Sequence, residues 1–196
     1  MKIKYLALLA LAFVCAPKAN AFEVYGLVSY DGSVYSGKPS NVTDTGGGVG
    51  YGFFGRLDLG PGQIESGFLY TVTSVTTQEV FGSAKTSGSF WEIPILYRIY
   101  VLPPFVSVAL GPDYAILGYN RVTVDGGNVA DGFSSGYKSH FGFEADVQAL
   151  QDLGENLSGV LDFRYRYGLA DALHIDGVGM RYQAFTISLG LQKRLE

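Results

Sequence analysis

Side chains alternate between apolar and polar along residues 90–101, and this alternation limits what the chain can fold into. One face of the segment is apolar and carries Trp91, Ile93, Ile95, Tyr97 and Ile99. The other face includes Glu92 and Arg98. A period of two is that of a β-strand, and the turn predicted at 102–104 joins it to a second strand. A sheet built from such strands has one face suited to lipid.

Further segments show the same strand pattern, and most are longer than the five or six residues of a usual globular strand. They match the roughly 9 to 11 residues that a tilted strand needs to cross a bilayer. The predicted strands are 22–30, 47–59, 63–75, 89–101, 105–118, 137–150, 157–168 and 181–195. The sequence therefore predicts an all-β fold, an eight-stranded antiparallel up-and-down transmembrane β-barrel.

The predicted connections alternate between short and long. The short ones are 60–62, 102–104 and 151–156, and the long ones are 31–46, 76–88, 117–136 and 169–180. In an outer-membrane barrel the short turns face the periplasm and the long loops face outward. Both chain ends are then expected in the periplasm.

The parity of each strand predicts which side chains point into the barrel. A soluble lipocalin-like barrel would also alternate, but its outer face would carry many lysines, and lysine is sparse here. The orientation of the first strand stays undecided, because Val24 and Val28 compete with Tyr25 and Leu27 for the outward face. The inward charged or titratable set is Arg56, Asp58, Glu65, Glu92, Arg98, Asp113, Lys138, His140, Glu144, Asp146, Asp162, Arg164 and Arg166.

The first 21 residues have the pattern of a secretory signal peptide. Basic residues precede an uncharged apolar run, and the Ala19-Asn20-Ala21 end is typical of a cleavage site, so residues 22–196 form the predicted barrel domain. Cys15 is the only cysteine, which excludes disulfides and thiolate metal sites from the mature domain. Removing Lys2, Lys4 and Lys18 from the 14 basic residues leaves 11 against 18 acidic ones, a charge of −7. This charge argues against nucleic acid as a partner.

Three segments resemble a known family. WEIPILYRIYVLPPFVSVALGPDYAIL, DFRYRYGLADAL and the closing AFTISLGLQKRLE are similar to segments of the outer membrane beta-barrel domain family of porin-like proteins. The resemblance implies an eight-stranded barrel related in shape to small OmpX-like adhesion and opacity barrels, and it implies no reaction. Many such barrels end in an aromatic residue that the assembly machinery reads, whereas this chain ends in Leu195 and Glu196.

The interior charges allow two interpretations. In the first they form a structural network of ion pairs, because removing one partner of a buried pair costs about 3 to 5 kcal/mol. In the second they line a narrow path for small solutes. An eight-stranded barrel is just wide enough for its side chains to fill, which favours the first.

Catalysis is the third hypothesis, in the form of a lipid A-modifying enzyme. His140 and Glu144 share a face, but Ser139 points the other way and Gly142 stands where a serine would be needed. His174 is predicted to be a solvated loop residue. The segment 125–132, DGGNVADG, has acidic residues and glycines that could hold calcium, but this composition is more typical of turns. No metal and no cofactor is predicted.

The sequence thus predicts a non-enzymatic integral outer-membrane barrel with a structural or surface-interaction role. Its expected partners are outer-membrane lipid, the barrel-assembly machinery and an extracellular ligand at the long loops. Closure of every sheet edge favours a monomer.

Overall fold

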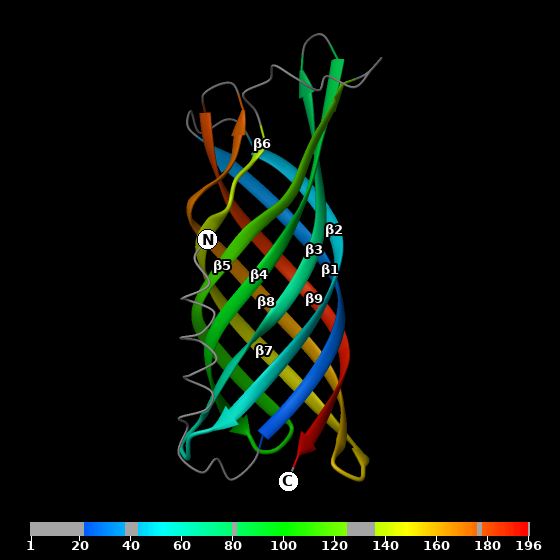
Figure 1. Cartoon of the computed structure of the whole chain (residues 1–196), viewed down its shortest axis with the longest axis vertical. Helices are drawn as coiled ribbons and strands as arrows, with labels where there is room; N and C mark the ends of the chain where they lie inside the picture. Colours follow the sequence, from blue (N-terminus) through cyan, green and yellow to red (C-terminus); the bar gives the residue numbers. More distant parts are fainter. Residues whose placement is uncertain (1–21, 38–42, 80–81, 125–135, 176–177, 196) are drawn as a thin grey trace.

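Antiparallel pairing between neighbouring strands builds the whole fold (Figure 1). The structure is a computed structural model, which describes residues 22–37, 43–79, 82–124, 136–175 and 178–195. The strands are β1 (Phe22–Gly37), β2 (Thr43–Asp58), β3 (Gln63–Glu79), β4 (Gly82–Leu102), β5 (Val106–Val124), β6 (Gly136–Tyr137), β7 (His140–Gly154), β8 (Leu157–Ile175) and β9 (Val178–Leu195). Among these residues no helix is long and apolar enough to cross a membrane.

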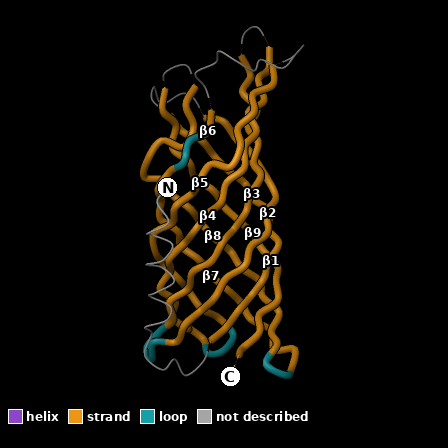
Figure 2. Tube along the Cα trace, viewed as in Figure 1, coloured by secondary structure: helices purple, strands orange, loops and turns teal. Residues whose placement is uncertain are grey.

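The sheet closes on itself. β1 pairs with β2 on one side and with β9 on the other, where Phe22 lies opposite Leu195. β6 and β7 form one strand position, interrupted at Lys138 and Ser139, and both pair with β8. The prediction of eight antiparallel up-and-down strands in a ring is therefore confirmed, and the tube in Figure 2 shows the crossing front and back walls.

One side-chain and one backbone hydrogen bond accompany the interruption between β6 and β7. The Leu117 amide donates to Ser139 Oγ over 2.9 Å, in place of a backbone carbonyl. The Lys138 amide donates to the Ala172 carbonyl over 2.7 Å and so keeps the register with β8. The parity of the strand is lost here, and Lys138 is exposed. Its predicted inward position is wrong for this reason.

Three tight turns lie at the end of the barrel that holds Phe22 and Leu195. Leu59 and Gly62 close the first with a backbone hydrogen bond of 2.9 Å, and residues 102–105 form the second. In the third, β7 and β8 continue to Glu155 and Asn156, whose φ angles are 50° and 62°. Two consecutive positive φ angles suit a two-residue hairpin turn. The predicted connection 151–156 is thus mostly strand.

The long connections predicted at the other end are also mostly strand. β1 and β2 stay paired up to Ser36 and Thr43, and β3 and β4 up to Glu79 and Gly82. The sequence there is rich in Gly, Ser and Thr, which suggests loops, but backbone hydrogen bonds do not depend on side-chain polarity. Figure 1 shows paired strands rising beyond the barrel wall at this end. The prediction of long loops is wrong for the described residues of 31–46, 76–88 and 169–180, which are strand. Residues 38–42, 80–81, 176–177 and, in the fourth connection, 125–135 lie outside the described part.

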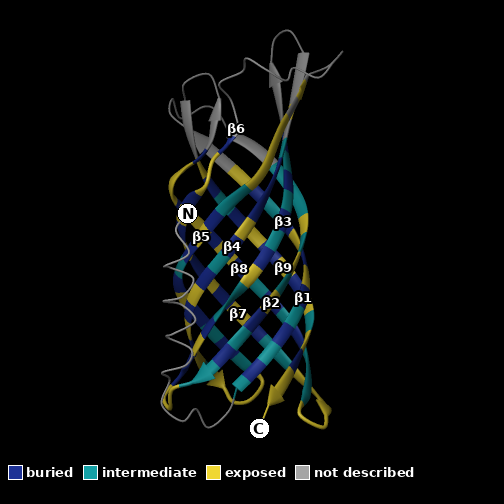
Figure 3. Ribbon diagram, in the orientation of Figure 1, coloured by how far each residue is buried: buried dark blue, intermediate teal, exposed yellow. Residues whose placement is uncertain are grey.

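Buried and exposed residues alternate along each strand, as the chequered ribbon of Figure 3 shows. Along β7 the residues from His140 to Gln148 are buried and exposed in strict turn. β1 is settled by the same criterion, since Tyr25 and Leu27 are buried inside while Val28 and Tyr30 are exposed. The inward residues include charged side chains, and the outward ones are largely apolar. The barrel is therefore inside out relative to a soluble one.

The outer face carries a continuous apolar belt. Its exposed side chains include Val28, Val49, Tyr51, Phe53, Phe68, Trp91, Ile95, Tyr97, Leu110, Phe141, Phe143, Val147, Tyr165, Phe185, Ile187, Leu189 and Leu191. Exposed apolar surface on this scale is stable only against another apolar phase. Every backbone group of a closed barrel is paired within the wall, which is what the hydrocarbon core of a bilayer requires.

The belt predicts a position-dependent cost of charge on the outer wall. Leu189→Arg places a guanidinium in mid-belt, and we expect the free energy of unfolding from lipid bilayers to fall by about 2 to 4 kcal/mol. Leu153→Arg, near the tight-turn end of β7, should cost less than about 1 kcal/mol. Reversible denaturant titration of both variants in vesicles measures the difference. Equal costs would contradict a lipid-facing belt.

Candidate functional site

The barrel lumen gathers the charged residues into one network around the carboxylate of Glu65 on β3. Glu65 Oε2 accepts hydrogen bonds from Nε of Arg56 on β2 at 2.7 Å and from Nε of Arg98 on β4 at 2.8 Å. Its other oxygen, Oε1, accepts one from the Tyr25 hydroxyl at 2.5 Å. The side chains of Glu65, Arg56 and Arg98 are completely buried. One carboxylate thus joins three neighbouring strands and β1.

Arg98 and Arg164 extend the network to the far wall. Arg98 Nη2 lies 2.8 Å from Asp146 Oδ2, while its Nη1 donates to Ser107 Oγ at 2.8 Å. Arg164 Nε donates to Asp162 Oδ1 at 2.8 Å, and its Nη1 donates to Glu144 Oε1 at 2.9 Å. β5, β7 and β8 are joined in this way.

Arg56 connects β9 and β7 to the network through amide side chains. Its Nη1 donates to Gln192 Oε1 on β9 at 2.7 Å, and its Nη2 donates to Gln148 Oε1 on β7 at 2.6 Å. All eight strand positions of the ring therefore contribute a side chain to one hydrogen-bonded cluster. Such a cluster holds the strands in register from within.

Two aromatic rings fill the space between the guanidinium groups. Tyr25 and Phe54 stack with their centroids 4.9 Å apart and their planes 13° from parallel. The Arg56 guanidinium lies 4.3 Å from the Tyr25 ring centre, and that of Arg164 lies 4.4 Å from the Phe54 centre. These cation–π contacts surround the cations with protein atoms in place of water.

A second charged layer lies further from the tight-turn end. Arg166 pairs there with Glu92 on β4 and with Asp31 on β1, whose Oδ1 lies 2.6 Å from Arg166 Nη2. Thr71 supports Glu92 by donating a hydrogen bond to its Oε1 at 2.7 Å, and Thr186 donates to Asp31. This layer repeats the arrangement of the first with fewer members.

An apolar cluster lies beyond the charged layers. It consists of Val75, Phe90, Ala115, Tyr137, Ala172, Tyr182 and Ala184. The imidazole of His140 packs edge-on against Phe90 and Tyr182, with centroids 5.4 and 5.3 Å away, and its Nδ1 lies 3.2 Å from the Lys138 carbonyl. His140 is thus a packing residue of this cluster.

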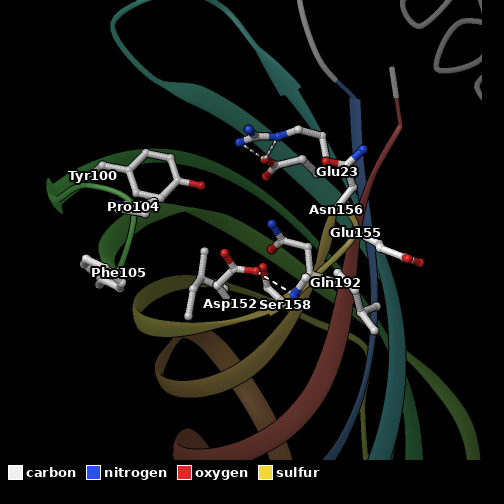
Figure 4. A pocket seen from close by; sticks show the side chains of 13 residues that line it. Glu23, Tyr100, Pro104, Phe105, Asp152, Glu155, Asn156, Ser158 and Gln192 are labelled. Atoms are coloured by element: carbon white, nitrogen blue, oxygen red, sulfur yellow. Dashed lines mark hydrogen bonds and ion pairs between the residues drawn. The ribbon is translucent and has the colours of Figure 1, made fainter.

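The lumen is hollow at the tight-turn end. A cavity of about 440 Å³ opens there between the turns (Figure 4). Glu23 lies on its wall and accepts a hydrogen bond from Arg194 Nη2 at 2.8 Å, while its other oxygen is 3.9 Å from Arg56 Nη1. The cavity therefore ends against the Glu65 network.

The structure places ten predicted interior residues inside the barrel. They are Arg56, Glu65, Glu92, Arg98, Asp113, His140, Glu144, Asp146, Arg164 and Arg166. Asp113 stands apart from the ion pairs, and its Oδ1 has no hydrogen-bond partner among the described residues. Asp162, also predicted inward, belongs to the network.

Besides that for Lys138, the prediction for His174 needs correction, and the prediction for Asp58 holds only in part. Asp58 is only partly buried, because it lies at the start of a turn and its Oδ1 accepts the Gly60 amide at 2.8 Å. His174 lies in β8 and not in a loop, although its side chain is outside the described set. The segment 125–132 and residues 1–21 are also outside that set.

Sequence parity missed several members of the network. Glu23, Tyr25 and Asp31 share one face of β1. Their inward position could not be predicted, because the sequence does not decide which face of this strand points inward. Gln148 and Gln192 have the right parity but are uncharged, so a search for charges passes over them. The signal that could have found them is the alternation of β7 and β9 themselves.

No catalytic or metal constellation appears among the described residues. Ser139 is exposed on the outer wall and its Oγ accepts the Leu117 amide, whereas His140 points inward. No group of three His, Cys, Asp or Glu side chains there has metal-binding geometry.

Comparison with known proteins yields only distant structural likeness. No protein-family profile and no curated protein sequence matches the chain. Neisserial surface protein A is 15% identical, with 87% of this chain and 96% of that chain covered and a TM-score of 0.49. Ail of Yersinia pestis, solved with the heparin analogue sucrose octasulfate, is 13% identical, with 89% and 99% covered and a TM-score of 0.44. The outer membrane protein AlkL is 11% identical, with 92% and 93% covered and a TM-score of 0.40.

Because these likenesses are low, the membrane assignment rests on the chain's own strand pairing, apolar belt and charged interior. Together they identify it as a transmembrane β-barrel.

The network predicts a large effect of neutralising its central carboxylate. Glu65→Gln leaves Arg56 and Arg98 buried without their shared anion, and we expect the free energy of unfolding in vesicles to fall by about 3 to 5 kcal/mol. Glu155→Gln makes the same chemical change in an exposed turn and should alter it by less than about 0.5 kcal/mol. A small effect of Glu65→Gln would show that Glu65 does not hold the network together.

Proposed function

We propose that this chain is an integral outer-membrane barrel with a structural or surface-interaction role, and that it is not an enzyme. The observation that carries the proposal is the filled lumen. Arg56, Arg98 and Arg164 are completely buried and form ion pairs with carboxylates of the lumen, and an apolar cluster lies beyond them. A lumen filled in this way serves to brace the wall.

The strand extensions beyond the barrel are the surface that this scaffold offers to other molecules. β3 and β4 remain paired out to Glu79 and Gly82, well beyond the belt. Such extensions hold a binding surface at a fixed distance from the membrane, with backbone pairing that limits its movement. An extracellular ligand would meet them first, as a monomeric barrel presents them away from the lipid. The export signal and the barrel-assembly machinery that the sequence predicts fit this placement.

The filled lumen favours this role over a channel. A path for solutes needs unpaired space along the axis, whereas the cavity at the tight-turn end meets the completely buried ion pairs of Glu65 with Arg56 and Arg98. Lipid A modification would need a nucleophile and a base on one face, and Ser139 and His140 lie on opposite faces.

Location and conductance test the proposal together. We expect the protein in the outer-membrane fraction, with gel mobility that changes on boiling, because a closed barrel resists detergent until it is heated. Purified protein in planar bilayers should show no stepwise conductance, because the Glu65 network closes the axis. An eight-stranded porin-like channel would instead give discrete steps, and protein in the soluble periplasm would refute membrane insertion.

A further inference from the structure

A hollow of about 530 Å³ lies on the outer wall, where the apolar belt ends toward the strand extensions. It runs across strands β1 to β5, and its sides include the exposed rings of Tyr30 and Tyr119. Val49 and Lys85 also line it. The hollow is separate from the lumen and from the network around Glu65.

Small residues form the floor of the hollow. Gly47 on β2 lies opposite Ser74 on β3, and Ser74 lies opposite Ser87 on β4. A Cβ added at Gly47 would lie 3.2 Å from the Tyr30 hydroxyl, which is a tight contact. The absence of a side chain at Gly47 therefore keeps the floor low beside Tyr30.

An aromatic row borders the hollow on the side of the belt. Tyr51 and Tyr70 lie with ring centroids 5.4 Å apart, and Tyr70 and Trp91 lie 4.8 Å apart. Tyr51 is two residues beyond Val49 on the same face of β2, so the row and the hollow are roughly one pleat apart. A molecule in the hollow would thus touch aromatic surface on one side.

Cations border the hollow on its other side. Lys85 lines it, and Arg121 on β5 lies opposite Ser87. Lys85 pairs with Thr123, which makes Lys85 and Arg121 diagonal neighbours on one face of the wall. Both are exposed and form no ion pair with a described residue. Glu65, Glu92 and Asp113, the carboxylates of β3, β4 and β5 whose side chains are described, are buried in the lumen and do not offset this charge outside.

We propose that this hollow binds the phosphorylated headgroup of a membrane lipid. The phosphate would lie between Lys85 and Arg121 at the Ser87 end of the floor, and the acyl chains would run over Gly47 and along the Tyr51, Tyr70 and Trp91 row. Charge and position both select this occupant, because an amphiphile with an anionic head fits a site that is cationic on one side and apolar on the other. The inference rests on the proposed membrane location.

Lipid binding by the full barrel in neutral detergent tests the site. The probes are dioleoyl phosphatidate, a phosphate monoester, and dioleoyl phosphatidylcholine with the same chains, each titrated by native mass spectrometry. The wild-type barrel should prefer phosphatidate, and K85Q/R121Q should bind it on the order of 30-fold more weakly, since each surface cation contributes a several-fold effect. Gly47→Val should also weaken phosphatidate binding by filling the floor.

Two matched variants serve as controls. Lys193→Gln removes an exposed cation at the opposite end, and Gly26→Val adds a side chain on the outer wall where the nearest atoms lie 3.8 Å away. Both should bind phosphatidate like the wild type, and each variant is first shown to be folded by its mobility on an unboiled gel. Equal binding by all folded variants would overturn the site and leave the barrel assignment intact. Binding of inorganic phosphate that is lost in K85Q/R121Q, without any preference among lipids, would identify a soluble-anion site and also overturn the proposal.

Discussion

The shared carboxylate of Glu65 is the interaction on which the rest of this barrel depends. It accepts hydrogen bonds from Arg56 and Arg98 in a space closed to water, and Tyr25 binds its second oxygen. A charge facing lipid would find no such partner, so the outer wall has to be apolar and the charges have to meet inside. The inside-out character of the sheet and the filled lumen are two consequences of the same constraint.

That constraint also separates the roles of the two surfaces. The interior side chains brace the ring of strands, because the buried cations are surrounded by carboxylates, amides and aromatic rings. Contacts with other molecules are therefore left to the outer wall and to the paired strands beyond it. The hollow beside Tyr30 and Tyr119 lies where these two regions meet.

Much of this could be read from the sequence because parity is a strong signal in long strands. The alternation of Trp91 to Ile99 with Glu92 and Arg98 gave both the strand and its orientation, and the same reasoning placed Arg164 and Arg166 inside. The positions of the tight turns at residues 60–62 and 102–104 followed from glycine and proline.

Parity failed where the strand pattern is interrupted or weak. Lys138 lies at the break between β6 and β7, so counting residues from His140 puts it on the wrong side. β1 mixes small and apolar residues on both faces, which hid Glu23 and Asp31. The polar, glycine-rich extensions resemble loops in composition, because their pairing depends on the backbone and on a neighbouring strand. The alternation of β7 places Gln148 inside, but its hydrogen bond with Arg56 joins strands that are not neighbours and so depends on the closed barrel.

Lipid accessibility along one strand tests the inside-out sheet most directly. β9 suits the measurement, because its residues 184–189 alternate between small inward and large outward side chains. With Cys15 replaced by serine, single cysteines at these positions carry spin labels in lipid vesicles, and dissolved oxygen reports contact with the bilayer. The account predicts high oxygen accessibility at Phe185, Ile187 and Leu189 and low accessibility at Ala184, Thr186 and Ser188. The opposite alternation, or none, would contradict it.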